Sequence, residues 1–276
     1  MMDRPILFSA PMVRALLEGR KTQTRRILGN LDVFRLPDGS EAPVSCLQVD
    51  GEALPRVSIG RVLTGKKLKA AVGDRLWVRE AWKPGAWRDD GRIAIDYRAS
   101  PEMTNTPWCS LPNTIDWPNL HRLWTDELLA GGFRPNSNGF HHWEAGQSPL
   151  KWRPSIFMPR WASRITLEVA DVRVQRLQDI SEADAIAEGI YCSTLGAERD
   201  MLDDADGWAE MPDDTPIYFP SDDEDDHLYT SSQMAFHELW DRINDDRGYG
   251  SRKNPWVSAY TFHVINRNID QIGAVT

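Results

Sequence analysis

The segment from Arg164 to Leu177 restricts the fold of this chain more than any other part of the sequence. Leu167 and Val169 fall on one face by two-residue alternation, as in a strand with one buried face. Val172 and Val174 continue the alternation one residue out of phase. A phase slip inside one apolar run predicts a β-bulge between the two pairs, and a bulge bends the strand that contains it.

The other elements predicted from the sequence are short. The predicted strands are Pro5–Phe8, Arg75–Glu80 and Trp256–Ile265, and the predicted helices are Met12–Glu18, Ser181–Gly189 and Ser232–Asp245. Short strands with few helices between them favour an α+β domain built around a small, bent sheet or barrel.

Three stretches look like insertions into a single domain that spans residues 1–276, at about 29–56, 100–150 and 195–228. The middle stretch is rich in Pro, Asn, Gly and Trp, and this composition predicts long loops. The last stretch is acidic and contains few apolar residues, so we expect a mobile surface segment with little packing.

The charge of the chain is unevenly distributed. Residues 198–226 hold thirteen acidic side chains and a single basic one, which gives this segment a formal charge of −12. The formal net charge of −9 therefore leaves +3 for the rest of the chain. A body of this charge is compatible with a nucleic-acid ligand, although the whole chain is acidic.

The sequence offers no evidence for a metal or a cofactor. The cysteines are far apart and form no C-x-x-C pair, the histidines lack metal-site spacing, and there is no phosphate loop or dinucleotide fingerprint. We also find no signal peptide and no apolar stretch of the length that a membrane span needs, so we expect a soluble, cytoplasmic protein.

The segment Gly19–Arg26 combines an amine, two hydroxyls and several guanidinium groups directly after a helix end. Burial or neighbouring cations can lower the pKa of Lys21 enough for the amine to act as a base. Thr24 becomes a nucleophile when a base takes its proton, so this pair is a candidate acyl-transfer centre. The alternative is a basic, solvated turn. In a flat strand the two side chains would point to opposite faces, and they meet only if the chain bends.

Two carboxylates are candidates for the same chemistry. Glu188 lies in the last turn of the helix predicted at residues 181–189, where it could serve as a general acid/base or as a partner of Lys21. The alternative is an exposed glutamate paired with an arginine. Glu80, at the end of the strand that contains Trp77, is the rival carboxylate.

These segments resemble the ASCH family, a branch of the PUA-like superfamily. The family pattern G-x-K-x-x-x-x-R is met by Gly19, Lys21 and Arg26, and the G-D-x-L-x-V segment at Gly73–Val78 stands where the family has it. The blocks Trp-Asp-x-Ile-Asn and Asn-Pro-Trp-Val make the chain similar to long versions that phages and prophages carry. The resemblance covers about half of the chain, outside the insertions.

The resemblance implies a PUA-like small β-barrel with flanking helices and a cleft suited to nucleosides or nucleic acid. In one bacterial branch, the domain is an amidohydrolase that removes the acyl group from N4-acetylcytidine. Its catalytic set is Lys, Thr and Glu, and here the pattern K-T-x-T and a later helix supply Lys21, Thr24 and Glu188. The substrate-binding residues expected beside them are Gly19, Arg26, Trp77, Arg79 and Glu80.

Two further hypotheses remain open at this point. The chain could be a non-catalytic module that binds RNA or modified DNA, which needs cations and aromatic rings but no acid/base set. It could also be a phage accessory protein that acts in the host cytoplasm, with the acidic segment contacting a host protein or mimicking nucleic acid.

Overall fold

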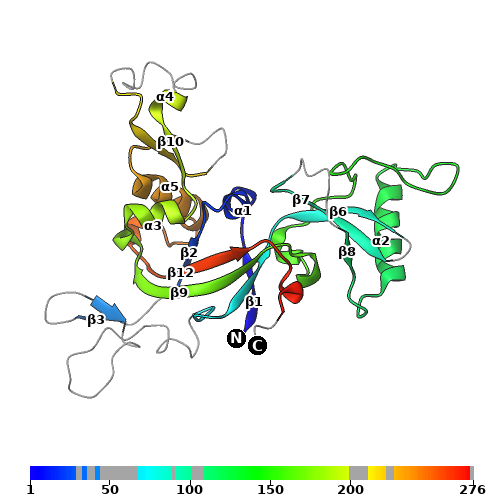
Figure 1. Cartoon of the computed structure of the whole chain (residues 1–276), viewed down its shortest axis with the longest axis horizontal. Helices are drawn as coiled ribbons and strands as arrows, with labels where there is room; N and C mark the ends of the chain where they lie inside the picture. Colours follow the sequence, from blue (N-terminus) through cyan, green and yellow to red (C-terminus); the bar gives the residue numbers. More distant parts are fainter. Residues whose placement is uncertain are drawn as a thin grey trace. The chain divides into compact units, whose positions relative to one another are not determined.

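The computed structural model describes residues 1–28, 33–35, 41–43, 68–88, 91–100, 108–198, 211–221 and 227–273 (Figure 1). Its strands are β1 (Asp3–Leu7), β2 (Gln23–Ile27), β3 (Val33–Arg35), β4 (Glu41–Pro43), β5 (Arg75–Arg79), β6 (Trp82–Trp87), β7 (Arg92–Tyr97), β8 (Cys109–Ser110), β9 (Thr166–Arg176), β10 (Tyr191–Thr194), β11 (Pro216–Phe219) and β12 (Trp256–Ile265). Its α-helices are α1 (Ala10–Leu17), α2 (Trp117–Ala130), α3 (Glu182–Ala187), α4 (Leu195–Glu198) and α5 (Ser232–Asn244), and short 3₁₀ turns connect several of these elements.

The described strands form several separate sheets. A five-stranded sheet has the order β1-β5-β9-β12-β2, a three-stranded sheet has the order β6-β7-β8, and β10-β11 and β3-β4 are two-stranded. The mixed α and β content confirms the α+β class that the sequence predicts. No sheet among the described residues closes into a barrel, because β1 and β2 remain the two edges of the largest one.

Residue contacts divide the chain into two units. Unit 1 comprises Met1–Met2, Ala15–Arg75 and Glu168–Val264, and unit 2 comprises Asp3–Arg14, Leu76–Leu167 and Ile265–Thr276. Strands β5, β9 and β12 each have residues in both units. A single domain with insertions therefore stays a prediction.

Strand β9 shows the phase slip that the sequence predicts. Leu167 and Val169 are buried, Ala170 and Asp171 are both exposed, and burial resumes at Val172. Two consecutive exposed residues are expected where a strand changes the face that it presents to the core.

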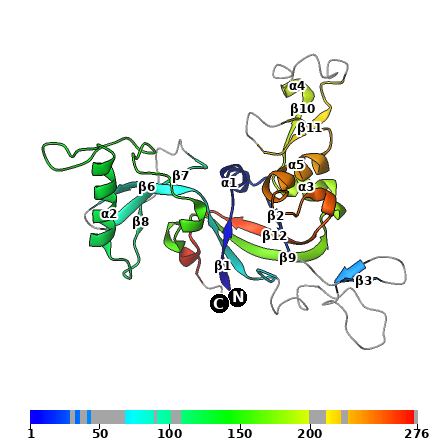
Figure 2. The same ribbon diagram turned by 180° about the vertical axis from the view of Figure 1, so that it is seen from behind.

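Unit 1 has a core in which helices α3 and α5 lie side by side, as both views show (Figures 1 and 2). Phe236 and Trp240 are buried on one face of α5, next to Ala185 of α3 and Val257 of β12. The helix predicted at Ser232–Asp245 is therefore confirmed to within a residue at its end.

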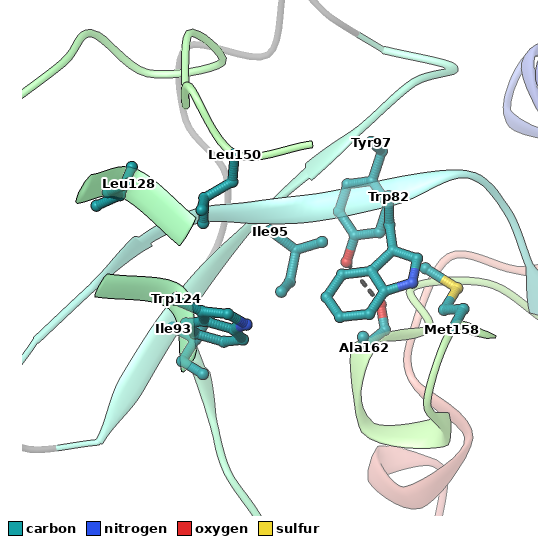
Figure 3. Close-up of a cluster of buried hydrophobic side chains, with 9 residues drawn as sticks. All are labelled: Trp82, Ile93, Ile95, Tyr97, Trp124, Leu128, Leu150, Met158 and Ala162. Atoms are coloured by element: carbon teal, nitrogen blue, oxygen red, sulfur yellow. Dashed lines mark hydrogen bonds between the residues drawn. The ribbon is translucent and has the colours of Figure 1, made fainter. Parts of the chain in front are cut away.

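Unit 2 contains an aromatic core centred on Trp82 and Trp124 (Figure 3). The Tyr97 hydroxyl donates a hydrogen bond to the Ala162 carbonyl oxygen over 2.8 Å, and a dashed line marks this bond in the figure. These tryptophans are buried in the core rather than presented to a ligand, which is the commoner role of such large rings.

The prediction of long loops across residues 100–150 is wrong for α2. Asp116 caps this fourteen-residue helix by accepting a hydrogen bond from the Asn119 backbone, and Pro118 stands at its start. Trp124 and Leu128, four residues apart, are buried on one face. Pro118 and Asn119, two of the residues whose types suggested loops, belong to the capped first turn, where both are tolerated.

The acidic stretch contains a packed segment. Strand β11 pairs with β10 in antiparallel register, Ile217 is fully buried, and Tyr218 packs against the core of unit 1. This part therefore departs from the expected segment with little packing, because Ile217, Tyr218 and Phe219 form a short apolar run. Trp208 lies outside the described residues, and mobility of the stretch stays a prediction.

None of the helices in the described part of the chain is both long and apolar enough to cross a membrane.

Candidate functional site

The chain turns between α1 and β2 and brings Lys21 against the end of α3. Gly19 follows the last turn of α1 with a φ of +75°, a conformation that favours glycine. The Lys21 backbone N–H then donates to the Ala15 carbonyl, and Lys21 forms an antiparallel bridge with Glu188. The bridge lies two residues before the regular part of β2.

Lys21 and Glu188 form a buried ion pair. The Lys21 Nζ lies 2.9 Å from Glu188 Oε2, and the same amine donates to the Glu188 backbone carbonyl over 2.5 Å. The exposed fraction is 2 % for Lys21 and 4 % for Glu188. The sequence alternatives of a solvated turn and an exposed glutamate are therefore both wrong for these two residues.

Gly189 allows this close approach. Its φ is +96°, and a Cβ built on it would lie 3.1 Å from the Lys21 Cβ and 3.1 Å from the Ala15 Cβ. Any side chain at this position would both strain the backbone and press on Lys21.

Arg25 extends the ion pair into a network. Its guanidinium donates to Glu188 Oε1 and to Asp184 Oδ2, each over 3.0 Å, and its side chain is fully buried. Gln23 and Arg173 also donate to Asp184. Arg25 and Asp184 were not among the residues predicted for the site.

A signal for these two residues was present in the sequence. Asp184 and Glu188 are four residues apart on one helix, a spacing that places both carboxylates on the same face. Gln23 and Arg25 are two residues apart in a strand and share a face as well. Two carboxylates on one helix face, opposite an arginine and a glutamine on one strand face, would have predicted the network, given the contact between β2 and α3.

Thr24 lies on the other face of β2. Its backbone is paired with Tyr260 of β12, and both residues are 1 % exposed. The Thr24 Oγ1 accepts a hydrogen bond from Arg26 Nη1 over 2.7 Å, and the same nitrogen donates to the Arg25 carbonyl oxygen. Arg26 is half-buried and acts electrostatically on both Lys21 and Glu188.

The electrostatics of the site favour a lysine that gives up its proton more readily than usual. Burial lowers the pKa of Lys21 below its ordinary value, although the Glu188 carboxylate and its hydrogen bond act in the opposite direction. The guanidinium groups of Arg26 and Arg25 lower this pKa further. Within the described chain, no group of three His, Cys, Asp or Glu side chains gathers as metal ligands.

The three other residues predicted to bind substrate belong to unit 2 and have partners there. Glu80 is 1 % exposed and makes a bidentate ion pair with Arg164, with both hydrogen bonds at 2.9 Å. The Arg79 guanidinium lies over the Trp77 ring and donates to the Met158 carbonyl oxygen. These contacts stabilise unit 2, and a substrate-binding role for the three residues stays a prediction.

Compared with protein-family models, curated proteins and solved structures, the chain matches none of them.

Proposed function

We propose that the protein is an amidohydrolase that removes the acyl group from N4-acetylcytidine-type nucleosides. The observation that carries the proposal is the buried Lys21–Glu188 ion pair. Thr24, the expected nucleophile, follows Lys21 by three residues in the same segment. A buried lysine of lowered pKa, held by a carboxylate and three residues before a threonine, is the kind of residue set that an acyl-transfer site of this kind needs.

We propose a PUA-like, ASCH-type fold as part of the same hypothesis. Support comes from the order of elements around the site. A helix precedes the G-x-K segment, and the long strand β9 precedes helix α3, whose C-cap is Glu188. We also propose that the protein acts in the cytoplasm.

In the first step, Lys21 acts as general base. The neutral amine takes the proton of the Thr24 hydroxyl, whose oxygen attacks the amide carbonyl carbon of the substrate. Arg26 donates to that oxygen and stabilises the charge that develops on it before the bond forms. Glu188 fixes the position of the amine through its carboxylate and its backbone carbonyl.

In the second step, the tetrahedral intermediate collapses and the bond to the cytosine amino nitrogen breaks. The Lys21 ammonium returns the proton to this nitrogen, so cytidine leaves and the acyl group stays on Thr24. Lys21 then deprotonates a water molecule, whose oxygen attacks the ester carbonyl. The bond to the Thr24 oxygen breaks, the Lys21 ammonium returns its proton to that oxygen, and the carboxylic acid leaves. Since Lys21 precedes the regular part of β2, strand alternation does not force its side chain away from Thr24.

The experiment is turnover of N4-acetylcytidine to cytidine, followed by chromatography without added metal. Thr24→Val removes the hydroxyl at nearly constant shape and should lower the rate about a hundredfold or more, whereas Thr24→Ser keeps a nucleophile and should retain activity. Lys21→Met should be as inactive as the valine variant, and circular dichroism checks that each variant folds.

Lys83→Met is the matched control, because Lys83 is a buried lysine of unit 2 outside the site. This variant should retain wild-type turnover. The proposed amidohydrolase activity would be refuted if no N4-acylated cytosine nucleoside tested is turned over. It would also be refuted if the Thr24→Val variant were as active as wild type.

The second candidate function is a non-catalytic module that binds RNA or modified DNA. The exposed cations Lys69 and Arg247 favour it, because backbone phosphates are recognised by such groups. A phage accessory role, with the acidic stretch contacting a host protein, belongs to this candidate. Salt-sensitive binding of a short RNA or single-stranded DNA, without turnover and without cytidine binding, would select it.

A further inference from the structure

Arg25 joins the two carboxylates of α3. Its Nη1 lies 3.0 Å from Glu188 Oε1, and its Nη2 lies 3.0 Å from Asp184 Oδ2. The Gln23 amide oxygen accepts a further hydrogen bond from Nη1, and the guanidinium lies over the Phe236 ring of α5. The Arg25 side chain is fully buried. Because burying charges offsets most of their attraction, such a bridge is weak evidence for a purely structural role.

Glu188 is shared between Arg25 and Lys21. Its Oε1 accepts from the Arg25 guanidinium, and its Oε2 accepts from the Lys21 amine over 2.9 Å. A hydrogen bond at each oxygen fixes the plane of the carboxylate in front of the amine. If Lys21 alone balanced this buried carboxylate, losing its proton would leave the negative charge uncompensated, and the amine would keep the proton. Arg25 removes that constraint, because it remains charged when the lysine becomes neutral.

The charges of the network balance without Lys21. Glu188 and Asp184 supply two negative charges. Arg25 and Arg173 supply two positive charges, and Arg173 Nη2 lies 2.9 Å from Asp184 Oδ1. A neutral Lys21 therefore leaves these four side chains without net charge, whereas its ammonium form adds one positive charge. Burial is the main cause of the lowered pKa of Lys21, and the charge of Arg25 acts in the same direction.

Other charged or titratable groups belong to the elements around this network. On α1, β2, β9 and β12, or in the turn after α1, they include Arg14, Glu18, Arg20, Arg26, Asp171 and Tyr260. Arg20 is paired with Glu18 over 2.6 Å. Arg26 acts on Lys21 in the same direction as Arg25. A substitution of Arg25 leaves all of these groups present, so a change in the protonation of Lys21 reports on Arg25 itself.

We infer that Arg25 is a positioning residue, which fixes Glu188 through Oε1 and offsets its charge so that Lys21 can exist as the neutral amine. The inference rests on the proposed function, in which this amine is the general base. Arg25 acts on the amine through Glu188, whereas Arg26 holds the Thr24 hydroxyl.

The experiment measures kcat/KM for N4-acetylcytidine as a function of pH in wild type and in Arg25→Met. Without the guanidinium, Glu188 favours the ammonium form of Lys21, so the midpoint of the profile should move to higher pH by on the order of one unit. Turnover below both midpoints should therefore fall about tenfold and recover as the pH is raised. A variant that is merely less well folded would lose turnover at every pH without a moved midpoint.

Two further variants separate the charge of Arg25 from its geometry. Asp184→Asn removes the other carboxylate partner, so the charge of Arg25 is less offset and the midpoint should move to lower pH, opposite to Arg25→Met. Arg25→Lys keeps the charge but loses the planar fork that reaches both carboxylates. Its midpoint should stay near that of wild type while kcat falls. If Arg25→Met does not fold, the shift in Asp184→Asn decides.

The matched control is Arg153→Met, which removes a half-buried arginine of unit 2 that lies 2.8 Å from Glu127. This variant should leave the midpoint unchanged. A second readout needs no substrate: NMR of isotope-labelled lysine side chains against pH follows the charge of the Lys21 amine, and Lys21→Met assigns its signal. This titration should move in the same directions as the kinetic midpoints.

Failure of this inference and failure of the enzyme give different results. Turnover with unmoved midpoints in Arg25→Met and Asp184→Asn, or with shifts of the same sign, overturns the role of Arg25 and leaves the amidohydrolase. Opposite shifts of the Lys21 titration, without turnover of any acylated substrate, support the control of the amine by Arg25 and refute the enzyme.

Discussion

Lys21 in unit 1 and Lys83 in unit 2 are both buried beside a carboxylate, but their surroundings differ in kind. The Lys21 amine is 2.9 Å from its carboxylate partner, which also binds an arginine. The Lys83 amine is 3.8 Å from Asp96 Oδ2 and donates instead to the Ser148 carbonyl oxygen over 2.5 Å. It also lies 4.7 Å from the centre of the Trp152 ring.

The buried oxygen atoms near the two lysines also differ in whether they take part in hydrogen bonds. Both Glu188 carboxylate oxygens accept a hydrogen bond, whereas in the described structure Asp96 Oδ2 and Ser148 Oγ have none although they are buried. Burial lowers the pKa of both lysines. A buried lysine of lowered pKa is therefore not sufficient to mark a site, and the distinguishing feature is the network of opposite charges around Lys21, in which both oxygens of the carboxylate partner are hydrogen-bonded.

The largest expected difference between the two lysine sites is in the free energy of unfolding that is lost when the carboxylate partner, Glu188 or Asp96, is neutralised. Glu188→Gln leaves Lys21 and Arg25 buried without a full counter-charge, which should destabilise the protein by about 3–5 kcal/mol. Asp96→Asn should cost only about 1 kcal/mol, because this carboxylate is not hydrogen-bonded to its lysine. Urea denaturation of both variants measures the difference. Equal losses would show that the two lysines depend on their partners alike.

A smaller difference in the free energy of unfolding is expected between alanine substitutions at the two glycines near Lys21. Gly189→Ala strains a backbone with φ of +96° and also presses on the Lys21 side chain, so we expect a loss of about 2–3 kcal/mol. Gly19→Ala has open space around the added methyl group and only the strain of a φ of +75°, with an expected loss of about 1 kcal/mol. Thermal unfolding compares them, and a reversed order would contradict the close packing of Gly189 on Lys21.

The smallest effect is the pH dependence of stability, which should have opposite signs in the two units. Burial would raise the pKa of Asp184, but hydrogen bonds from Arg173 and Gln23 and the charges of Arg173 and Arg25 lower it overall. Its stabilising contribution is present above the ordinary pKa and is lost as the pH falls through the lowered value. Burial raises the pKa of Asp96 despite Lys83, so its contribution is present at low pH and is lost as the pH rises through the raised value.

Asp184→Asn and Asp96→Asn isolate these two contributions. Relative to wild type, the first variant should lose most stability near neutral pH and little near pH 3. The second should lose least near neutral pH. Denaturation at a series of pH values from about 3 to 7 tests both signs, and parallel curves for the two variants would contradict the comparison.

The sequence alone determined the elements that depend on local pattern. The phase slip of β9, the capped start of α3 at Ser181 and the apolar face of α5 were all predicted, because alternation, capping and helical spacing act over a few residues. Lys21, Thr24 and Glu188 were selected as candidates from their residue types and from the resemblance of the motifs around them to a known family. Helix α2 was not predicted, because the stretch was judged by its Pro, Asn and Gly content and not by the cap and apolar face of this segment.

Only the tertiary structure decided which side chains meet. Lys21 and Glu188 are 167 residues apart, and no local pattern specifies that the turns at Gly19 and Gly189 meet and bring the two side chains to 2.9 Å. Burial of Lys83 depends likewise on packing against the segment around Ser148, so the sequence could not distinguish it from a surface lysine. Desolvation and long-range charge interactions set the properties of a site, and both exist only once the chain has folded.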